Sequence, residues 1–217
     1  DPNSTTHSIG WRTRAIAALT GIGVLLAATP ASAHHAMGSK LPANFFEGFL
    51  SGVAHPIIGI DHLAFVIASG LLAALLGQKG LWVPIAFAIA AMGGTQIHIM
   101  QWNLPAAETC IALSVLTFGL LLALKERPHP LLTIALAAIA GIFHGYAYGE
   151  SIVGAQMTPL LAYLAGFTLI QLSIALLARY IGSTTLQAVS ERPTLALRFA
   201  GFTICGIGAA FLATSIQ

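Results

Sequence analysis

A small set of histidine and acidic side chains is embedded in otherwise apolar sequence, and these residue types can bind metal ions. The set is His55, Asp61, His62, His98, His144 and Glu150. Neutral imidazole combined with carboxylate suits borderline divalent cations such as Ni²⁺, Co²⁺, Zn²⁺ and Cu²⁺, whereas Mg²⁺ and Ca²⁺ prefer oxygen ligands. The residue types therefore predict a site for a divalent transition metal.

Each of these residues also has a purely structural interpretation. His55 can cap the helix that Pro56 begins, and His98 can face water at an interface. Asp61 and His62 can form an orienting hydrogen-bonded pair that holds no metal. The methionines and cysteines of the same stretches are expected to serve in packing.

The spacing of two of the histidines limits how they can share an ion. His55 and His62 are seven residues apart, so on a regular helix they share a face but stand about 10.5 Å apart along the axis. Pro56 and Gly59 lie between them, and both residue types permit an unwound segment. Two arrangements stay open: a broken helix of the kind that places ligands in transporters, or two successive sites along one path.

The amino-acid composition indicates that these residues lie in a membrane protein. Of the 217 residues, 57% are hydrophobic and only 7% are charged, against roughly 25% charged residues in soluble domains. Seven acidic and nine basic residues cannot cover a soluble globule, so we expect an integral membrane protein. A net charge of +2 argues against a nucleic-acid partner, and two cysteines argue against a disulfide-dense scaffold.

The first 33 residues have the pattern of a secretory signal peptide. Arg12 and Arg14 are followed by an apolar stretch over 15–28, and Ala31-Ser32-Ala33 fits the cleavage site. An uncleaved first span is the alternative, although the stretch is shorter than the roughly 20 residues that a span needs. We therefore predict a signal peptide over 1–33 and one membrane domain over 34–217.

Six further apolar runs predict an all-α membrane protein, because each backbone amide in lipid must be satisfied within its own helix. The predicted spans are 56–76, 81–100, 106–124, 131–148, 159–180 and 195–214, and an amphipathic stretch over 45–54 precedes the first of them.

The basic residues orient these spans. Six of the seven basic residues after the signal peptide fall in alternate connections or at the ends that flank them, which the positive-inside rule makes cytoplasmic. Both mature termini are then extracytoplasmic. In this orientation the intramembrane histidines and acidic residues all fall in the outer half of the bundle, where ionisable groups are candidates for function.

Residues 55–62 have the form H-P-x-x-G-x-D-H, and residues 143–147 have the form F-H-G-x-A. These two motifs resemble those of the HupE/UreJ family of nickel and cobalt permeases, most closely its cyanobacterial branch. The resemblance implies uptake of Ni²⁺ or Co²⁺ across the cytoplasmic membrane, with His55, Asp61, His62 and His144 as site residues. It also implies a histidine just after signal cleavage, which His34 or His35 matches.

The sequence departs from the family within the second motif. The family usually continues A-H-G-x-E, whereas this chain reads Ala147-Tyr148-Gly149-Glu150. Tyr148 therefore stands in the place of a second histidine. The glutamate comes one residue early, which moves it about 100° around a helix.

The resulting hypothesis is a secondary permease. His34 and His35 would capture the ion outside, the intramembrane His and Asp residues would bind it, and the glycine-rich spans would rearrange to release it inward. The chain has no G-x-x-x-x-G-K-[ST] sequence for ATP, and we expect no tightly bound cofactor. The alternatives are an intramembrane zinc hydrolase and a non-transporting metal-binding or assembly factor; no protein partner or oligomeric state is predicted.

Overall fold

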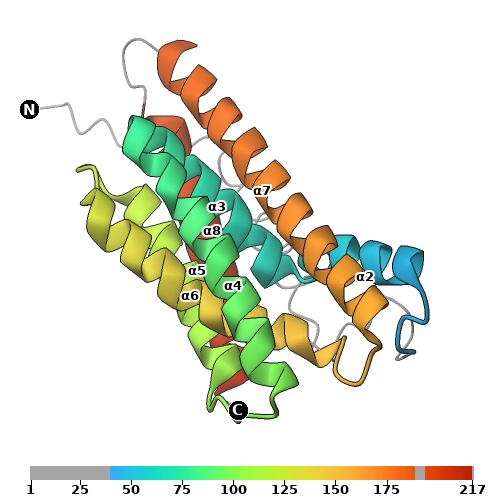
Figure 1. Ribbon diagram of the computed structural model, residues 1–217. Coiled ribbons are helices and arrows are strands. Elements are labelled where there is room, and N and C mark those ends of the chain that lie inside the picture. The colour runs from blue at the N-terminus through green and yellow to red at the C-terminus, as the bar shows by residue number, and fades with distance from the viewer. Residues whose placement is uncertain (1–39, 189–193, 217) are drawn as a thin grey trace, which may run out of the picture.

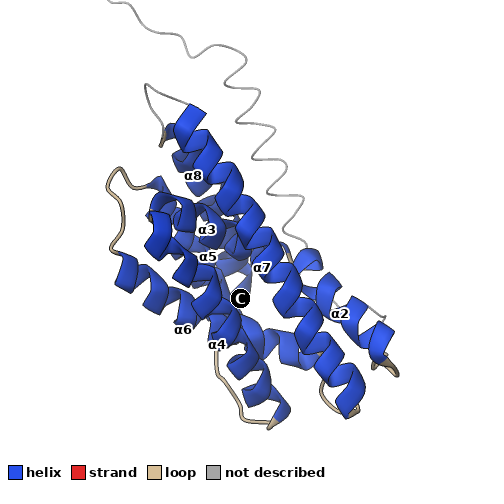
Figure 2. Cartoon of the chain, turned by 45° about the horizontal axis from the view of Figure 1, so that its top comes forward, coloured by secondary structure: helices blue, strands red, loops and turns tan. Residues whose placement is uncertain are grey.

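The computed structural model describes residues 40–188 and 194–216, and every regular element in these ranges is a helix (Figures 1 and 2). The predicted signal peptide over 1–33, His34, His35 and Arg192 lie outside the described residues. The helices, in chain order, are α2 (Phe45–Ile58), α3 (Ile60–Leu75), the 3-10 helix η1 (Gly77–Leu81), α4 (Trp82–Ile99), α5 (Ala107–Ala123), α6 (Pro130–Glu150), α7 (Met157–Ala188) and α8 (Leu195–Ser215).

The helices confirm the all-helical class and a multi-pass membrane protein. Four segments are long and apolar enough to cross a membrane: Gly77–Ile99, Pro130–Glu150, Met157–Ala188 and Leu195–Ser215. The bent pair α2–α3 makes a fifth if it counts as one span. Helix α5 has 17 residues, about 25 Å, which is short of a hydrocarbon core of roughly 30 Å. By length and composition the described residues therefore contain four or five candidate spans, whereas six were predicted.

The predicted first span is interrupted. Residues 56–58 belong to α2, and Gly59 separates α2 from α3 in an extended conformation with φ −74° and ψ 104°. The two helix axes differ in direction by 81°. Pro56 has no N–H to donate to the preceding turn, so the helix is weakened at this point.

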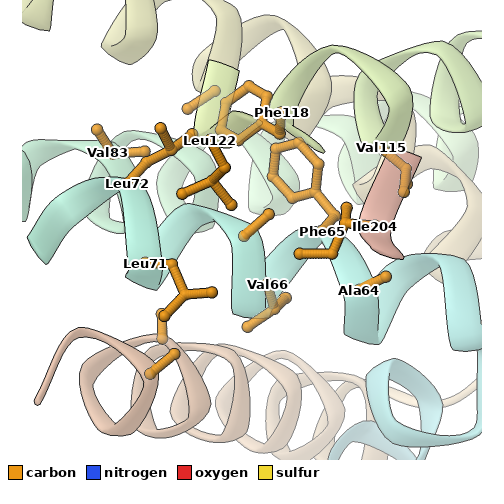
Figure 3. Close-up of a cluster of buried hydrophobic side chains, with 14 of the residues drawn as sticks. Ala64, Phe65, Val66, Leu71, Leu72, Val83, Val115, Phe118, Leu122 and Ile204 are labelled. Carbon is orange, nitrogen blue, oxygen red and sulfur yellow. The ribbon is translucent and has the colours of Figure 1, made fainter. Parts of the chain in front are cut away.

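Helix α3 is the centre of the bundle. Twelve of its sixteen residues are buried, as expected of a helix that is apolar on all sides and surrounded by others. Its side chains form the main hydrophobic core together with residues of α5 and α8, including Phe118, Leu122 and Ile204 (Figure 3).

Around α3 the remaining helices form three closely packed pairs, α4 with α6, α5 with α8, and α2 with α7. Glycines make the close approach possible in each pair. An added methyl group would overlap backbone atoms of the partner helix at Gly94 on α4, at Gly119 on α5 and at Gly52 on α2. Small residues serve this purpose in membrane bundles, where lipid gives no hydrophobic driving force between helices.

The basic residues gather at one end of the bundle. The 3-10 helix η1 carries Lys79, the loop after α5 carries Lys125 and Arg127, and both connections lie at the upper end in Figure 1. Arg198, near the start of α8, donates from Nε to the carbonyl of Ala123 at the end of α5, at 2.9 Å. The loops that follow α4 and α6 lie at the opposite end (Figure 1).

Candidate functional site

The break at Gly59 brings His55 and His62 together. Their ring centroids are 5.9 Å apart, although the two residues would be about 10.5 Å apart along a regular helix. Of the two arrangements that the spacing left open, the structure has the broken helix. Gly59 also makes room for the second ring, because a methyl group there would lie 2.6 Å from Cδ2 of His62.

His62 also contacts His144 on α6, and these two rings begin a chain of hydrogen bonds. Nδ1 of His62 lies 2.7 Å from Nδ1 of His144, and Nε2 of His144 lies 2.9 Å from Oγ of Ser114. The Ser114 hydroxyl donates to the carbonyl of Ile111 at 2.7 Å.

These hydrogen bonds are consistent with one assignment of the tautomers of the neutral rings. In this assignment the Ser114 hydroxyl donates to the Ile111 carbonyl and accepts from Nε2–H of His144. Nδ1 of His144 then accepts from Nδ1–H of His62. The lone pair of His62 is consequently on Nε2, which is the form that a metal ligand needs when its other nitrogen is held by a hydrogen bond.

His55 is oriented in a similar way by α7 and by the segment after α6. Its Nδ1 lies 3.0 Å from Oγ of Ser151 and 3.1 Å from the hydroxyl of Tyr163. Tyr163 donates its hydroxyl hydrogen to the carbonyl of Tyr148 at 2.8 Å. An Nδ1–H on His55 is an assignment that fits both contacts, and it leaves the lone pair on Nε2.

Tyr148 fills the space beside both histidines. Its ring centroid is 5.0 Å from that of His55 and 4.8 Å from that of His62. The side chain is fully buried, and its hydroxyl has no hydrogen-bond partner within the described residues. A buried hydroxyl without a partner costs free energy, so this group is a polar component of the site that the fold itself does not need.

Asp61 adds a carboxylate next to the rings. Its Oδ1 accepts from the backbone N–H of His62 at 2.9 Å, in the first turn of α3. A negative charge at this end of a helix is favourable. This hydrogen bond is made to the backbone of His62 and does not itself test the orienting pair of Asp61 with the His62 ring.

An apolar layer closes the site on the side of the hydrophobic core. The ring of His144 lies 4.7 Å from that of Phe65 and 5.4 Å from that of Phe87. Phe65 and Phe118 are in turn 4.4 Å apart (Figure 3). All three phenylalanines are buried, so apolar rings cover His144 on this side.

The other expected ligands do not join this cluster. His98 packs on Tyr146, with ring centroids 4.3 Å apart, and its Nδ1 has no hydrogen-bond partner within the described residues. Glu150 is exposed at the last residue of α6. Within the described part of the chain, no three His, Cys, Asp or Glu side chains are grouped closely enough to hold one metal ion.

The structure also adds residues that the sequence interpretation missed. Ser114, Ser151 and Tyr163 make hydrogen-bond contacts with the histidines, and Tyr148 packs beside His55 and His62. None of these side chains is charged, so a search for ionisable groups in apolar segments passes over them. The only signal was Tyr148, noted as a departure from the family motif.

Comparison with known proteins agrees with the motifs. The chain matches the family described as HupE / UreJ protein over residues 22–211. It is 35% identical over 187 residues to Protein HupE of Rhizobium leguminosarum bv. viciae, an alignment that covers 85% of this chain and 92% of that protein. No solved structure matches the chain. With these matches across most of its length, the chain belongs to the HupE/UreJ family.

Proposed function

We propose that this chain is a secondary permease that takes up Ni²⁺ or Co²⁺ across the cytoplasmic membrane. The HupE/UreJ family is associated with nickel and cobalt uptake, and its membrane proteins are transporters rather than enzymes. This association favours a permease over the zinc hydrolase that the residue types alone left open.

The observation that carries the proposal is the pair His55 and His62 at the α2–α3 break. Two imidazoles that share one ion have ring centres about 5–6 Å apart when each metal–nitrogen bond is about 2.1 Å. The observed separation of 5.9 Å is compatible with a shared ion. Imidazole is a good ligand for Ni²⁺ and Co²⁺, and the Asp61 carboxylate supplies a nearby compensating charge.

In this proposal His144 is a positioning residue. Both of its ring nitrogens are engaged, one with His62 and the other with Ser114, and the side chain is fully buried. Such hydrogen bonds to a ligand fix its tautomer and orientation. His144 therefore holds His62 ready to coordinate.

The basic end of the bundle supports an outward-facing position of the cluster. Lys79, Lys125 and Arg127 lie at that end, which the positive-inside rule assigns to the cytoplasm. His144 lies six residues before the opposite end of α6, about 9 Å along the helix. The cluster then faces the outside, where His34 and His35 would deliver the ion.

Uptake of radiolabelled Ni²⁺ and Co²⁺ by cells that express the chain tests this function. We expect uptake that His55→Ala and His62→Ala both abolish at equal protein level. His129→Ala is the matched control, because His129 is exposed at the start of α6, and it should leave uptake unchanged. Absence of uptake above the empty vector, or uptake that survives both substitutions, would rule out this permease mechanism.

A further inference from the structure

A neutral polar side chain on α7 is buried without any hydrogen-bond partner. Gln171 is 1% exposed, and neither its Nε2 nor its Oε1 has a partner within the described residues. It belongs to the buried face of α7 that also contains Tyr163, Phe167 and Ala175. That face contacts the histidine cluster through Tyr163, which lies against His55, and through Phe167, which lies against Tyr148.

Thr168 is a second such group on the same helix. Its Oγ1 is buried and has no partner within the described residues. Thr133, Thr185 and Thr203, by contrast, each donate to the backbone carbonyl four residues earlier in the chain. Residues three apart are neighbours on a helix surface, so Thr168 and Gln171 present a hydroxyl and an amide side by side.

The fold does not account for this amide. Burial of a polar group without a hydrogen bond is unfavourable, and the penalty applies to both ends of the Gln171 amide. A methionine or leucine at this position would fill the same apolar surroundings without that penalty. Intramembrane polar groups that are unfavourable for folding are candidates for a role in function.

Gln171 lies between the histidine cluster and the end of the bundle that carries the basic residues. Gln171 follows Tyr163 by eight residues, about 12 Å along α7. This displacement leads away from His55 and toward the end of the bundle that carries the basic residues (Figure 1). Beneath His144 the way is filled by Phe65, Phe87 and Phe118, whereas the α7 face offers polar groups at this depth.

We infer that Gln171 and Thr168 form a second, weaker station for the transported divalent cation, between the histidine cluster and the cytoplasmic end. The inference rests on the proposed function. An amide oxygen and a hydroxyl oxygen are harder donors than imidazole and suit Ni²⁺ and Co²⁺ less well, so an ion binds there more weakly. The unpartnered Nε2 of Gln171 would donate to a water molecule that accompanies the ion.

Equilibrium binding of Ni²⁺ to the purified full chain in lipid nanodiscs tests the inference. We expect two classes of site. Gln171→Met should weaken the low-affinity class by about tenfold or more and keep the high-affinity class, whereas His62→Ala should do the reverse. Gln187→Met, on the exposed part of the same helix, should change neither.

Thermal unfolding without metal tests whether Gln171→Met is folded as stably as the unsubstituted chain. Because the amide has no partner, Gln171→Met should unfold at the same temperature as the unsubstituted chain or at a higher one. A clearly lower unfolding temperature would show that the amide stabilises the fold, and this result would overturn the inference. A single class of site in the unsubstituted chain, or both classes intact in Gln171→Met, would also overturn it.

Flux measurements separate this inference from the proposed function. In proteoliposomes Gln171→Met should lower the initial rate of Ni²⁺ uptake about tenfold while the high-affinity class remains filled; an unchanged rate overturns the inference. If the unsubstituted chain shows no flux, the permease function fails, and the two-class binding result still decides whether Gln171 forms a site.

Discussion

The Nδ1 atoms of His62 and His144 lie 2.7 Å apart, so one ring must donate its hydrogen and the other must accept it. When Ser114 accepts from Nε2–H of His144, His62 is the donor and keeps its lone pair on Nε2. In this assignment Ser114 on α5 determines the tautomer of the candidate metal ligand His62 on α3.

Ser114→Ala should weaken metal binding without touching a ligand. The change removes the acceptor of Nε2–H in His144, a fully buried ring, and should lower the free energy of unfolding by about 1–3 kcal/mol. Loss of such an outer hydrogen bond also lowers metal affinity by about 10–100-fold. Calorimetric Ni²⁺ titration would measure the effect, with Ser173→Ala on the exposed side of α7 as the control. Wild-type affinity in Ser114→Ala would contradict the tautomer assignment.

Tyr148→His should tighten Ni²⁺ binding. The new imidazole would replace a ring that lies 5.0 Å from His55 and 4.8 Å from His62, so it adds a third nitrogen donor beside the pair. We expect an affinity gain of at least about tenfold, or about 1.4 kcal/mol.

Tyr148→Phe is the matched control for the histidine substitution. It keeps the ring and removes a buried hydroxyl that has no partner within the described residues, so the unfolding temperature should not fall. Equal Ni²⁺ affinities of the histidine and phenylalanine variants would show that this position does not face the ion.

Gly59→Ala should separate the two histidines. The added methyl group would lie 2.6 Å from Cδ2 of His62 and 3.3 Å from Oδ1 of Asp61, so the imidazole must move. Overpacking of this kind costs about 1–3 kcal/mol of stability, and we expect Ni²⁺ affinity to fall by about tenfold or more.

A second glycine provides the comparison for Gly59→Ala. Gly93 on α4 has no atom within 4 Å of an added methyl group, so Gly93→Ala should keep the Ni²⁺ affinity and raise the helix stability by about 0.5–1 kcal/mol. Equal affinities of the two alanine variants would mean that the His62 ring position does not determine binding.

Gly201→Ala should loosen the contact between α5 and α8. Its methyl group would lie 2.7 Å from the backbone nitrogen of Ala123, and we expect the free energy of unfolding to fall by about 1–3 kcal/mol. Gly206, on the same helix, has no atom within 4 Å of an added methyl group, so Gly206→Ala should not destabilise the chain. Denaturant titration of the two purified variants makes the comparison, and equal stabilities would contradict the close helix contact.

The sequence predicted the helices and the break in the first of them, but it did not predict which way the side chains of each helix face. Apolar runs mark the helices because lipid demands them, and Pro56 and Gly59 mark the one break. Glu150 was included with His144 because both fall at one depth, but six residues amount to about 600° of helix rotation, which turns the two side chains to different sides of α6. Hydropathy predicts how deep a residue lies in the membrane. The direction in which its side chain points depends on which face of the helix packs against the other helices.

The neutral polar residues were missed for another reason. Ser114, Tyr163 and Gln171 carry no charge, and their significance comes from partners on other helices or from the lack of any within the described residues. Those relationships join positions 30 and 108 residues apart in the chain. Only the packed structure shows them.

The histidine cluster is assembled from all three glycine-packed helix pairs. His55 belongs to the α2–α7 pair, His144 to the α4–α6 pair and Ser114 to the α5–α8 pair, while His62 lies on the central helix. Because the cluster takes residues from all three pairs and from the central helix, a rotation of one pair relative to another would change the distances within the cluster. Under the proposed function, an ion shared by His55 and His62 would favour the bundle conformation in which both imidazoles reach it, so that metal binding and helix arrangement would be linked.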